Sequence, residues 1–327
     1  MTTTIKDLGE IELLNRLKRF MRSAQIDDDV AEINTINKNL LINTDLLVEK
    51  IHFSEEISNA KDIGWKCITT NISDLICSGS DNIISFSVGL VLPANTRWQW
   101  VEHLYEGMRE AMQEFGGEII GGDCSCGETK MISITAIGEM KPPRLHRGNA
   151  LPGDYIVNTG FHGLSRLGLA LLTSEQLPSE ISISSNLTNK AINAHKRPYP
   201  ALKALKALKE CKPKSLSWRA AGTDSSDGLI ESIRGICQSS NCQAILSKSS
   251  ILRDPDWPKD SLWDEWMLKG GEDYELIVTL PREWAEAFSK ELDSAHIIGF
   301  IKEGKPNISW DNLEPINIEE YSLFQHF

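Results

Sequence analysis

The sequence predicts a mixed α/β (α+β) protein of two domains. Its 327 residues exceed an average single domain and would supply ample core for two domains of roughly 150 residues each. Segments with strand-like alternation and segments with helical apolar spacing follow one another along the chain. The prolines and charges of 141–148 suggest a boundary, so we expect one domain over 1–143 and another over 144–327.

Composition limits the classes of partner. The formal charge of −12 offers no broad basic surface, so we expect no nucleic-acid partner. The same charge would repel a phosphorylated ligand unless metal ions and a few placed cations reverse the local field. No basic leader and no apolar run approaching about 18 residues is present, so we expect a cytoplasmic protein with no membrane partner. We interpret the seven cysteines as free thiols.

Helices and strands alternate through the first half. Apolar residues at helical spacing predict a helix over 10–23, and the run at 40–44 predicts a strand that ends at Asp45. A helix is expected over 61–79 with Gly79 as its C-terminal cap. Asn71, Asp74 and Ser78 share a polar line on this helix, which is either a solvated surface or faces a metal ion.

The remaining elements complete two layers. Alternating apolar residues over 84–92 predict a half-buried strand of an antiparallel sheet with helices on one side. A core-facing helix is expected over 98–115, with strands over 118–120, 131–138 and 155–159. Gly160–Gly163 is expected to open a helix whose start could receive phosphate, although such turns also occur without ligands.

Gly121, Gly122 and Asp123 follow the short strand 118–120 and are expected to form a turn at the end of the sheet. Glycines let backbone N–H groups approach an anion, and a carboxylate can hold a bridging cation. A plain loop is the alternative, because Gly and Asp are ordinary turn residues. Similar acidic stretches recur elsewhere, so we hypothesise one site built from many carboxylates: Asp28, Asp29, Asp45, Asp74, Asp224, Asp227, Glu272 and Asp273.

Several short motifs occur in an order typical of one enzyme family. They are Asn43-Thr44-Asp45, His52-Phe53, Asn71-Ile72-Ser73-Asp74-Leu75, Gly121-Gly122-Asp123, Pro152-Gly153-Asp154, Asp224-Ser225-Ser226-Asp227-Gly228-Leu229 and Gly270-Gly271-Glu272-Asp273-Tyr274-Glu275-Leu276. In this combination the chain resembles the bacterial thiamine-monophosphate kinase family from about residue 10 to its end. That family belongs to a superfamily with aminoimidazole ribonucleotide synthetase and selenophosphate synthetase.

The resemblance implies a homodimer formed through the N-terminal sheet, with ATP in a cleft between the two domains and thiamine monophosphate as substrate. It implies magnesium ligands at Asp29, Asn43, Thr44, Asp45, Asp74, Asp123, Asp224 and Asp227. Asp74, Asp123 and Asp227 would be the catalytic carboxylates, and Gly122, Asp123, Arg147 and Ser226 would bind the nucleotide. His52, Glu272 and Tyr321 would contact the substrate. Taken alone, a single His is more often a surface or core residue than a ligand contact, and the resemblance reverses that interpretation of His52.

The chain also departs from the family pattern. Asp27 replaces a glycine, and Tyr321 stands where well-known relatives have Trp. Cys124, Ser125 and Cys126 stand where Thr, Thr and Arg are common, and Arg166-Leu167 replace a pair of residues that are usually small. We expect these changes to tune affinity and rate rather than the reaction type, because the carboxylates are retained.

The expected reaction is transfer of the γ-phosphoryl group of ATP to the phosphate of thiamine monophosphate, assisted by magnesium. Two alternatives remain open. One is another ATP-dependent enzyme of the superfamily, which would activate an amide or carbonyl oxygen and release ADP with free phosphate. The other is a non-catalytic ATP-binding relative, which magnesium-ATP would stabilise without being consumed.

Overall fold

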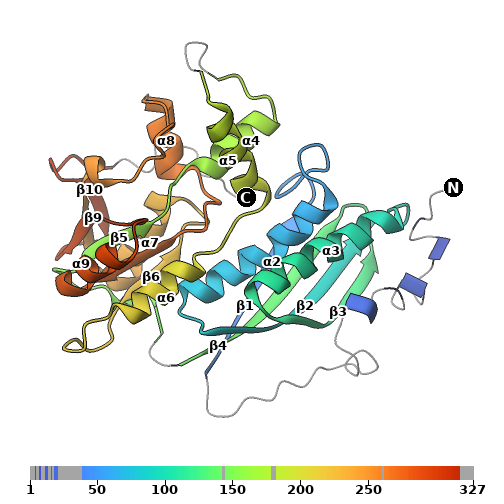
Figure 1. Cartoon of the computed structure of the whole chain (residues 1–327), viewed down its shortest axis with the longest axis horizontal. Helices are drawn as coiled ribbons and strands as arrows, with labels where there is room; N and C mark the ends of the chain where they lie inside the picture. The colour runs from blue at the N-terminus through green and yellow to red at the C-terminus, as the bar shows by residue number, and fades with distance from the viewer. Residues whose placement is uncertain are drawn as a thin grey trace. The chain divides into compact units, whose positions relative to one another are not determined.

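The structure is a computed structural model that describes residues 4, 7–8, 12–13, 16, 18–20, 39–141, 144–177, 182–259 and 261–316. The predictions for Asp27, Asp28, Asp29 and Tyr321 fall outside these residues. The chain divides into two compact units, the first comprising Met1–Leu75 with Ser80–Pro142 and the second Ile76–Gly79 with Pro143–Phe327. Each unit contains helices packed on a β-sheet (Figure 1).

In the described part of unit 1, the elements are η1 (Lys18–Phe20), β1 (Asn39–Val48), α2 (Ala60–Cys77), β2 (Asn82–Leu92), α3 (Trp98–Phe115), β3 (Glu118–Cys126) and β4 (Met131–Met140). The last two residues of α2 belong to unit 2. The four strands form one sheet in the order β1-β4-β2-β3. Strand β4 pairs antiparallel with both β1 and β2, whereas β3 pairs parallel with β2. The sheet is therefore mixed, which corrects the expectation of an antiparallel one.

Helices α2 and α3 pack closely because each has a glycine at the contact. A Cβ on Gly64 would lie 1.9 Å from the carbonyl oxygen of Leu104, and one on Gly107 would lie 1.8 Å from that of Lys61. The helices cover a sheet face of buried side chains that includes Phe86, Val88 and Ile134. The other face of β1 exposes Leu40, Ile42 and Leu46, whose exposed fractions are 38%, 64% and 52%.

The helix expected over 61–79 is confirmed, and so is its cap. Gly79 adopts a φ of 96°, in the left-handed region that glycine enters without steric cost. Its N–H bonds the carbonyl of Ile76 at 2.8 Å, and the N–H of Ser80 bonds that of Leu75 at 2.9 Å. These two bonds form a Schellman motif, which ends the helix and turns the chain toward β2.

Two local expectations for the sheet are wrong. Gly121, Gly122 and Asp123 lie inside β3, because the strand continues along β2 from Glu118 to Cys126 instead of ending at residue 120. A register shift between Ile83 and Ser85 breaks the expected alternation at the start of β2. Ile83 is buried there instead of Ile84, since a bulge moves the following residues to the other face.

The described elements of unit 2 are η2 (Arg147–Asn149), β5 (Tyr155–Thr159), α4 (Leu164–Leu172), α5 (Ser185–Lys196), α6 (Leu202–Glu210), β6 (Ala221–Asp224), α7 (Leu229–Ser240), β7 (Gln243–Leu246), η3 (Lys248–Ser250), α8 (Ser261–Lys269), β8 (Leu276–Leu280), α9 (Arg282–Glu291), β9 (Ala295–Lys302) and β10 (Asn307–Trp310). The strands form a sheet in the order β10-β7-β9-β5-β8-β6. Only β10 and β7 pair in parallel among them. In neither unit is a described helix long and apolar enough to cross a bilayer.

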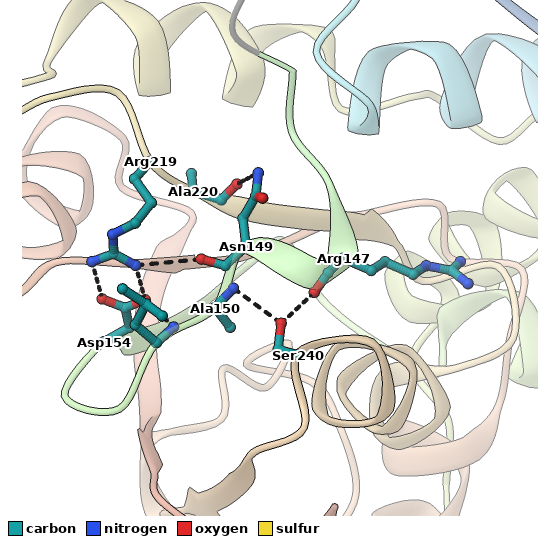
Figure 2. A network of polar contacts seen from close by, with 8 residues as sticks. Arg147, Asn149, Ala150, Asp154, Arg219, Ala220 and Ser240 are labelled. Atoms are coloured by element: carbon teal, nitrogen blue, oxygen red, sulfur yellow. Dashed lines mark hydrogen bonds and ion pairs between the residues drawn. The ribbon is translucent and has the colours of Figure 1, made fainter.

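An ion pair between a buried carboxylate and a half-buried arginine fixes the chain where it enters β5. Asp154 is 2% exposed, and its carboxylate accepts hydrogen bonds from both terminal nitrogens of Arg219, at 2.5 and 2.7 Å, and from the N–H of Leu151. Figure 2 shows this pair beside Asn149, whose side-chain amide donates to the carbonyl of Ala220 at 3.2 Å. The Pro152-Gly153-Asp154 motif therefore has a structural role, because its carboxylate holds the segment before β5.

Replacing Asp154 by Asn should destabilise the protein by about 2 kcal/mol, because Arg219 loses a charged partner and the buried amide cannot accept both of its hydrogen bonds. Chemical denaturation followed by circular dichroism measures the change. Asp311→Asn is the matched control, since Asp311 is exposed in the same unit, and it should change stability by under about 0.5 kcal/mol. Equal effects of the two substitutions would contradict the role of the ion pair.

Candidate active site

The side chain of Asn43 links β1 to the polar line of α2. Its Nδ2 donates to Asp74 Oδ2 at 2.9 Å, to Asn71 Oδ1 at 3.2 Å and to the carbonyl of Asn71 at 3.3 Å. Its Oδ1 is buried and has no hydrogen-bond partner among the described residues. An unpartnered amide oxygen beside a carboxylate is a fitting donor set for a hard cation such as Mg²⁺.

The neighbours of Asn43 on β1 lie on different faces. Asp45 pairs with Ile134 and so faces the helices, on the same side as Asn43. Thr44 faces the other way, and its hydroxyl lies 2.8 Å from that of Thr135. Of the three expected ligands on β1, the side chains of Asn43 and Asp45 therefore lie on one face of the sheet. The side chain of Thr44 lies on the opposite face, so only its main chain is next to them.

Gly122 and Asp123 lie at the opposite edge of the same sheet, since β4 and β2 separate β3 from β1. Asp123 pairs with Gly89, Gly89 with Ser133, and Ser133 with Leu46, so these residues share the outer face of the sheet. Gly122 has a packing role, because a Cβ there would lie 1.8 Å from the carbonyl oxygen of Val88. Unit 1 alone therefore does not bring Asp123 together with Asp74.

His52 lies in the loop after β1, and its Nδ1 accepts a hydrogen bond from the N–H of Val48 at 3.1 Å. Five residues of strand separate Val48 from Asn43, which corresponds to about 17 Å. Across the described ranges, no three His, Cys, Asp or Glu side chains gather closely enough to hold a metal ion by themselves. The single site of many carboxylates is thus not assembled by the described residues of either unit alone.

In unit 2 a short loop between β6 and α7 carries the next predicted residues. Asp224 ends β6 and is 4% exposed, and its Oδ1 accepts a hydrogen bond from the hydroxyl of Ser226 at 2.9 Å. Ser232 of α7 donates to the carbonyl of Asp224 at 2.7 Å and so fixes the end of the strand. Asp227 is exposed, and no described residue pairs with its carboxylate. Its oxygens remain available to a ligand.

Arg147 lies next to this loop. Its Nε donates to the hydroxyl of Thr223 at 2.9 Å, whereas its two terminal nitrogens have no acceptor among the described residues. Ser240 donates to the carbonyl of Arg147 at 2.7 Å and accepts from the N–H of Ala150 at 3.0 Å. In Figure 2 the main chain of Arg147 is held by Ser240 while the guanidinium projects away from the Asp154–Arg219 pair. The arrangement holds a cation beside Thr223, the residue that precedes Asp224.

The segment 270–276 packs against the same loop with an unusual backbone. Gly271, Glu272 and Tyr274 all have left-handed φ values, of 63°, 55° and 53°. Such values are uncommon for residues other than glycine and persist only where surrounding contacts enforce them. Here the N–H of Glu272 bonds the carbonyl of Ser226 at 2.6 Å. Glu272 and Ser226 are therefore brought together, as their predicted roles in one site require.

Two further carboxylates of this segment are partly buried. Asp273 accepts hydrogen bonds from the N–H groups of Gly163 at 2.7 Å and Ser165 at 3.1 Å, so it caps the start of α4. Glu275 accepts from the hydroxyl of Thr159 at 2.6 Å. Burial raises the pKa of each carboxyl to about 7. Because Asp273 occupies the N–H groups at the start of α4, the expectation that this helix start receives phosphate is not supported.

A serine, a histidine and a glutamate also meet beside α4. His195 of α5 places its Nδ1 3.1 Å from the hydroxyl of Ser165 and 3.3 Å from Glu272 Oε2. A catalytic relay needs the hydroxyl and the carboxylate on different ring nitrogens, and here both contact the same one. The arrangement is therefore a positioning contact that orients Glu272.

The sequence predicts Asp273 as one of several carboxylates of a shared site, whereas in the structure its side chain caps the start of α4. No role is predicted from the sequence for Glu275 or His195. For Glu275 a signal was present, since Glu272, Asp273 and Glu275 fall close together just before the apolar run 276–278. Carboxylates beside a buried strand need hydrogen-bond partners, which marks them as structural or functional residues. Nothing in the sequence points to His195, because its contact with Glu272 depends on the packing of α5.

The family of this chain follows from its similarity to known proteins. The family model described as "AIR synthase related protein, N-terminal domain" matches residues 27–140. A thiamine-monophosphate kinase of Prochlorococcus marinus is 48% identical over 323 residues, which cover 99% of this chain and 97% of that protein. The chain belongs to the thiamine-monophosphate kinase family. A second family member, from Synechococcus elongatus, is 35% identical over 99% of this chain and 98% of its own length.

A solved structure supports the same assignment. It is described as "AaThiL complexed with AMPPCP and TMP", and it matches with a TM-score of 0.75 at 28% identity, covering all of both chains. The match therefore covers the whole chain, and the mixed α/β class expected from the sequence is confirmed.

The raised pKa of Glu275 predicts how stability depends on pH in this kinase. A carboxyl whose folded pKa lies near 7, above its ordinary 4.5, stabilises the fold when neutral, and that contribution is lost as pH rises through 7. Glu275→Gln cannot ionise, so its free energy of unfolding should rise relative to wild type by roughly 2–3 kcal/mol between about pH 5 and pH 8. Denaturant titrations across this range measure the difference.

Glu314→Gln serves as the control, because Glu314 is exposed in the same unit. Its difference from wild type should not change with pH. If the Glu275→Gln difference were equally flat, Glu275 would be ionised throughout, and the effect assigned to burial would be wrong.

Proposed function

We propose that the chain transfers the γ-phosphoryl group of ATP directly to the phosphate of thiamine monophosphate, which gives thiamine diphosphate and ADP. The observation that carries the proposal is the 48% identity to a thiamine-monophosphate kinase over nearly the full length of both chains. The structural relative described with AMPPCP, an ATP analogue, and TMP supports the same pair of substrates.

The chemistry needs little from acids and bases. The attacking oxygen belongs to a phosphate that is already ionised at neutral pH, so no general base is required. The difficulty is to bring two anions into line within a chain of net charge −12. We therefore assign catalysis to alignment and to local charge neutralisation, in which Arg147 offers its unpaired guanidinium nitrogens to the nucleotide phosphates.

Magnesium fits the oxygen donors of both units. Asn43 and Asp74 would hold an ion in unit 1, because the buried Oδ1 of Asn43 lacks a partner beside the carboxylate of Asp74. Asp224 and Asp227 supply carboxylates at one loop of unit 2, where Ser226 orients Asp224. Bound magnesium would supply neutralisation of the phosphate charges and hold the transferring group in line. Asp29 remains proposed as a further ligand.

Substrate contacts are assigned to Glu272, His52 and Tyr321. Glu272 is the best supported of these, because its backbone is fixed against Ser226 and its carboxylate is oriented by His195. We propose that it binds the cationic part of the thiamine moiety, since a carboxylate oriented by a buried side chain keeps its geometry on binding. The roles of His52 and Tyr321 rest on the family resemblance.

We also propose a homodimer formed through the sheet of unit 1. Leu40, Ile42 and Leu46 expose an apolar stripe on the outer face of β1, which water contact disfavours. A second copy packed on this face would cover the stripe. It would also approach Asp123, whose side chain lies on the same face in register with Leu46. We therefore propose that Asp123 acts beside the subunit interface, apart from Asn43 and Asp74.

Replacing Asp74 or Asp227 by Asn should lower the turnover number for thiamine diphosphate formation by roughly 100-fold or more, because each substitution removes a metal-binding charge. Both variants should keep the wild-type melting temperature within a few degrees, since Asn at position 74 can still accept from Asn43, and Asp227 is exposed. The assay is steady-state kinetics with detection of thiamine diphosphate, at several magnesium concentrations.

Asp293→Asn is the matched control, because Asp293 is exposed in unit 2 and belongs to no proposed site. It should retain wild-type turnover. Near-normal turnover of both the Asp74 and Asp227 variants would rule out the metal assignment while leaving the reaction itself to be judged from the wild-type products.

The dimer proposal predicts a solution mass of twice 36.5 kDa for the wild type by light scattering. Leu46→Lys should reduce this to the mass of one chain, because it places a charge in the apolar stripe. Leu313→Lys, at an exposed leucine of unit 2, should leave the mass unchanged. A wild-type protein with the mass of one chain, or a Leu46→Lys variant that stays dimeric, would contradict the proposed interface.

A further inference from the structure

A pocket of about 640 Å³ lies in unit 1, away from the cluster around Asn43. Its lining includes Glu55, Asn59, Pro93, Thr96, Trp100 and Lys130. These residues come from the loops that follow β1 and β2, from the first turns of α2 and α3, and from the residue before β4. The pocket therefore lies at the end of the sheet where β1 and β2 finish, a common position for ligand sites in α/β folds.

The pocket is separate from the proposed metal site. Ala60, the first residue of α2, lines the pocket, whereas Asp74 lies fourteen residues further along the same helix. At 1.5 Å per residue this separation is about 21 Å. A ligand held here would not touch Asn43 or Asp74.

Two buried polar atoms of the lining lack partners. Thr96 is 6% exposed, and its Oγ1 has no hydrogen-bond partner among the described residues. The Nε1 of Trp100 is likewise buried and unpartnered. An indole N–H can only donate, so a group that satisfies it must carry an acceptor. Because buried polar groups in folded proteins are nearly always paired, these two atoms point to a missing acceptor in the pocket.

The start of α3 adds positive charge at the same place. Arg97 is the N-cap residue, its side chain makes no cap hydrogen bond, and the first turn of α3 contains no acidic residue. The partial positive charge of this helix end is therefore uncompensated by α3 itself. By contrast, α2 begins with a closed cap, in which Asn59 Oδ1 accepts from the N–H of Asp62 at 2.9 Å.

The charged side chains of the lining also favour an anion. Arg97 has no acceptor among the described residues, and Glu55 is the single carboxylate of the lining. That carboxylate lies 2.7 Å from Lys130 Nζ, which also lies 5.4 Å from the centre of the Trp100 ring. Lys130 Nζ also lies 2.8 Å from Glu49, so two carboxylates neutralise it, and Arg97 is the cation of the lining that is left for an anion.

We propose that this pocket is a binding site for a small oxyanion, the phosphate or carboxylate group of a metabolite, separate from the site of phosphoryl transfer. The anion accepts hydrogen bonds from Trp100 Nε1 and Thr96 Oγ1, and the guanidinium of Arg97 closes over it at the start of α3. The flat ring of Trp100 forms one wall for the rest of the ligand.

The test is a titration of the full chain, labelled with ¹⁵N and free of magnesium and nucleotide, with inorganic phosphate and separately with acetate. Indole N–H signals of the nine tryptophans are followed by NMR, and Trp100→Phe assigns the signal of Trp100. Trp218 is an internal control, because its Nε1 is also buried and unpartnered but lies in unit 2. Sodium chloride at equal ionic strength controls for screening.

The expected result is a saturable shift of the Trp100 signal with at least one of the two anions below roughly 10 mM, with no shift of Trp218. Arg97→Gln should weaken this binding roughly tenfold or more, whereas Arg109→Gln, an exposed arginine further along α3, should not. The anion whose titration saturates the Trp100 shift identifies the class of ligand, phosphate or carboxylate.

A Trp100 signal whose chemical shift does not change with either anion would overturn the proposal. So would a shift reproduced by sodium chloride or unchanged in the Arg97→Gln variant. Because the readout is the indole signal and not turnover, failure here would leave the proposed kinase reaction untouched.

Discussion

The carboxylate of Asp273 accepts the main-chain N–H groups of Gly163 and Ser165, and most of the site in unit 2 depends on the segment that contains it. Within the same segment Glu275 bonds Thr159 at the end of β5, and its N–H bonds the hydroxyl of Ser225. The N–H of Glu272 bonds the carbonyl of Ser226. One stretch of chain thus joins β5, α4 and the loop after β6. Its left-handed residues follow from these contacts, because the backbone must turn sharply to make all of them.

Charge is the second constraint on this molecule. Burial raises the pKa of Asp273 and Glu275 to about 7, so the framework acids carry only part of their negative charge at neutral pH. The carboxylates that we assign to metal binding are different in kind: Asp227 is exposed, and Asp74 lies beside an amide oxygen that lacks a partner. Acids that support the fold are thereby separated from acids that can hold cations and, through them, phosphates.

Local patterns in the sequence predicted local structure well. The apolar stripe and Gly79 fixed α2 and its end, and the polar line placed Asn71 and Asp74 on one face, where both meet Asn43. Features that depend on partners distant in sequence were missed. Strand β3 runs through Gly121 and Gly122 because β2 supplies its hydrogen bonds, and Asp123 faces away from Asp74 because of sheet register. The contact of His195 with Glu272 likewise depends on helix packing. Propensity and spacing carry no information on such pairings.

Family membership, the oxygen-rich surroundings of Asn43 and the fixed cation Arg147 all lead to one claim, which is direct phosphoryl transfer between two phosphates. The most direct test is quantitative mass detection of products after the purified protein is incubated with magnesium-ATP and thiamine monophosphate, beside a reaction that lacks the thiamine compound. Direct transfer predicts thiamine diphosphate and ADP in equal amounts, with neither formed in the control. ADP accompanied by free phosphate and no thiamine diphosphate would contradict it, as would a folded, ATP-binding protein that forms no product.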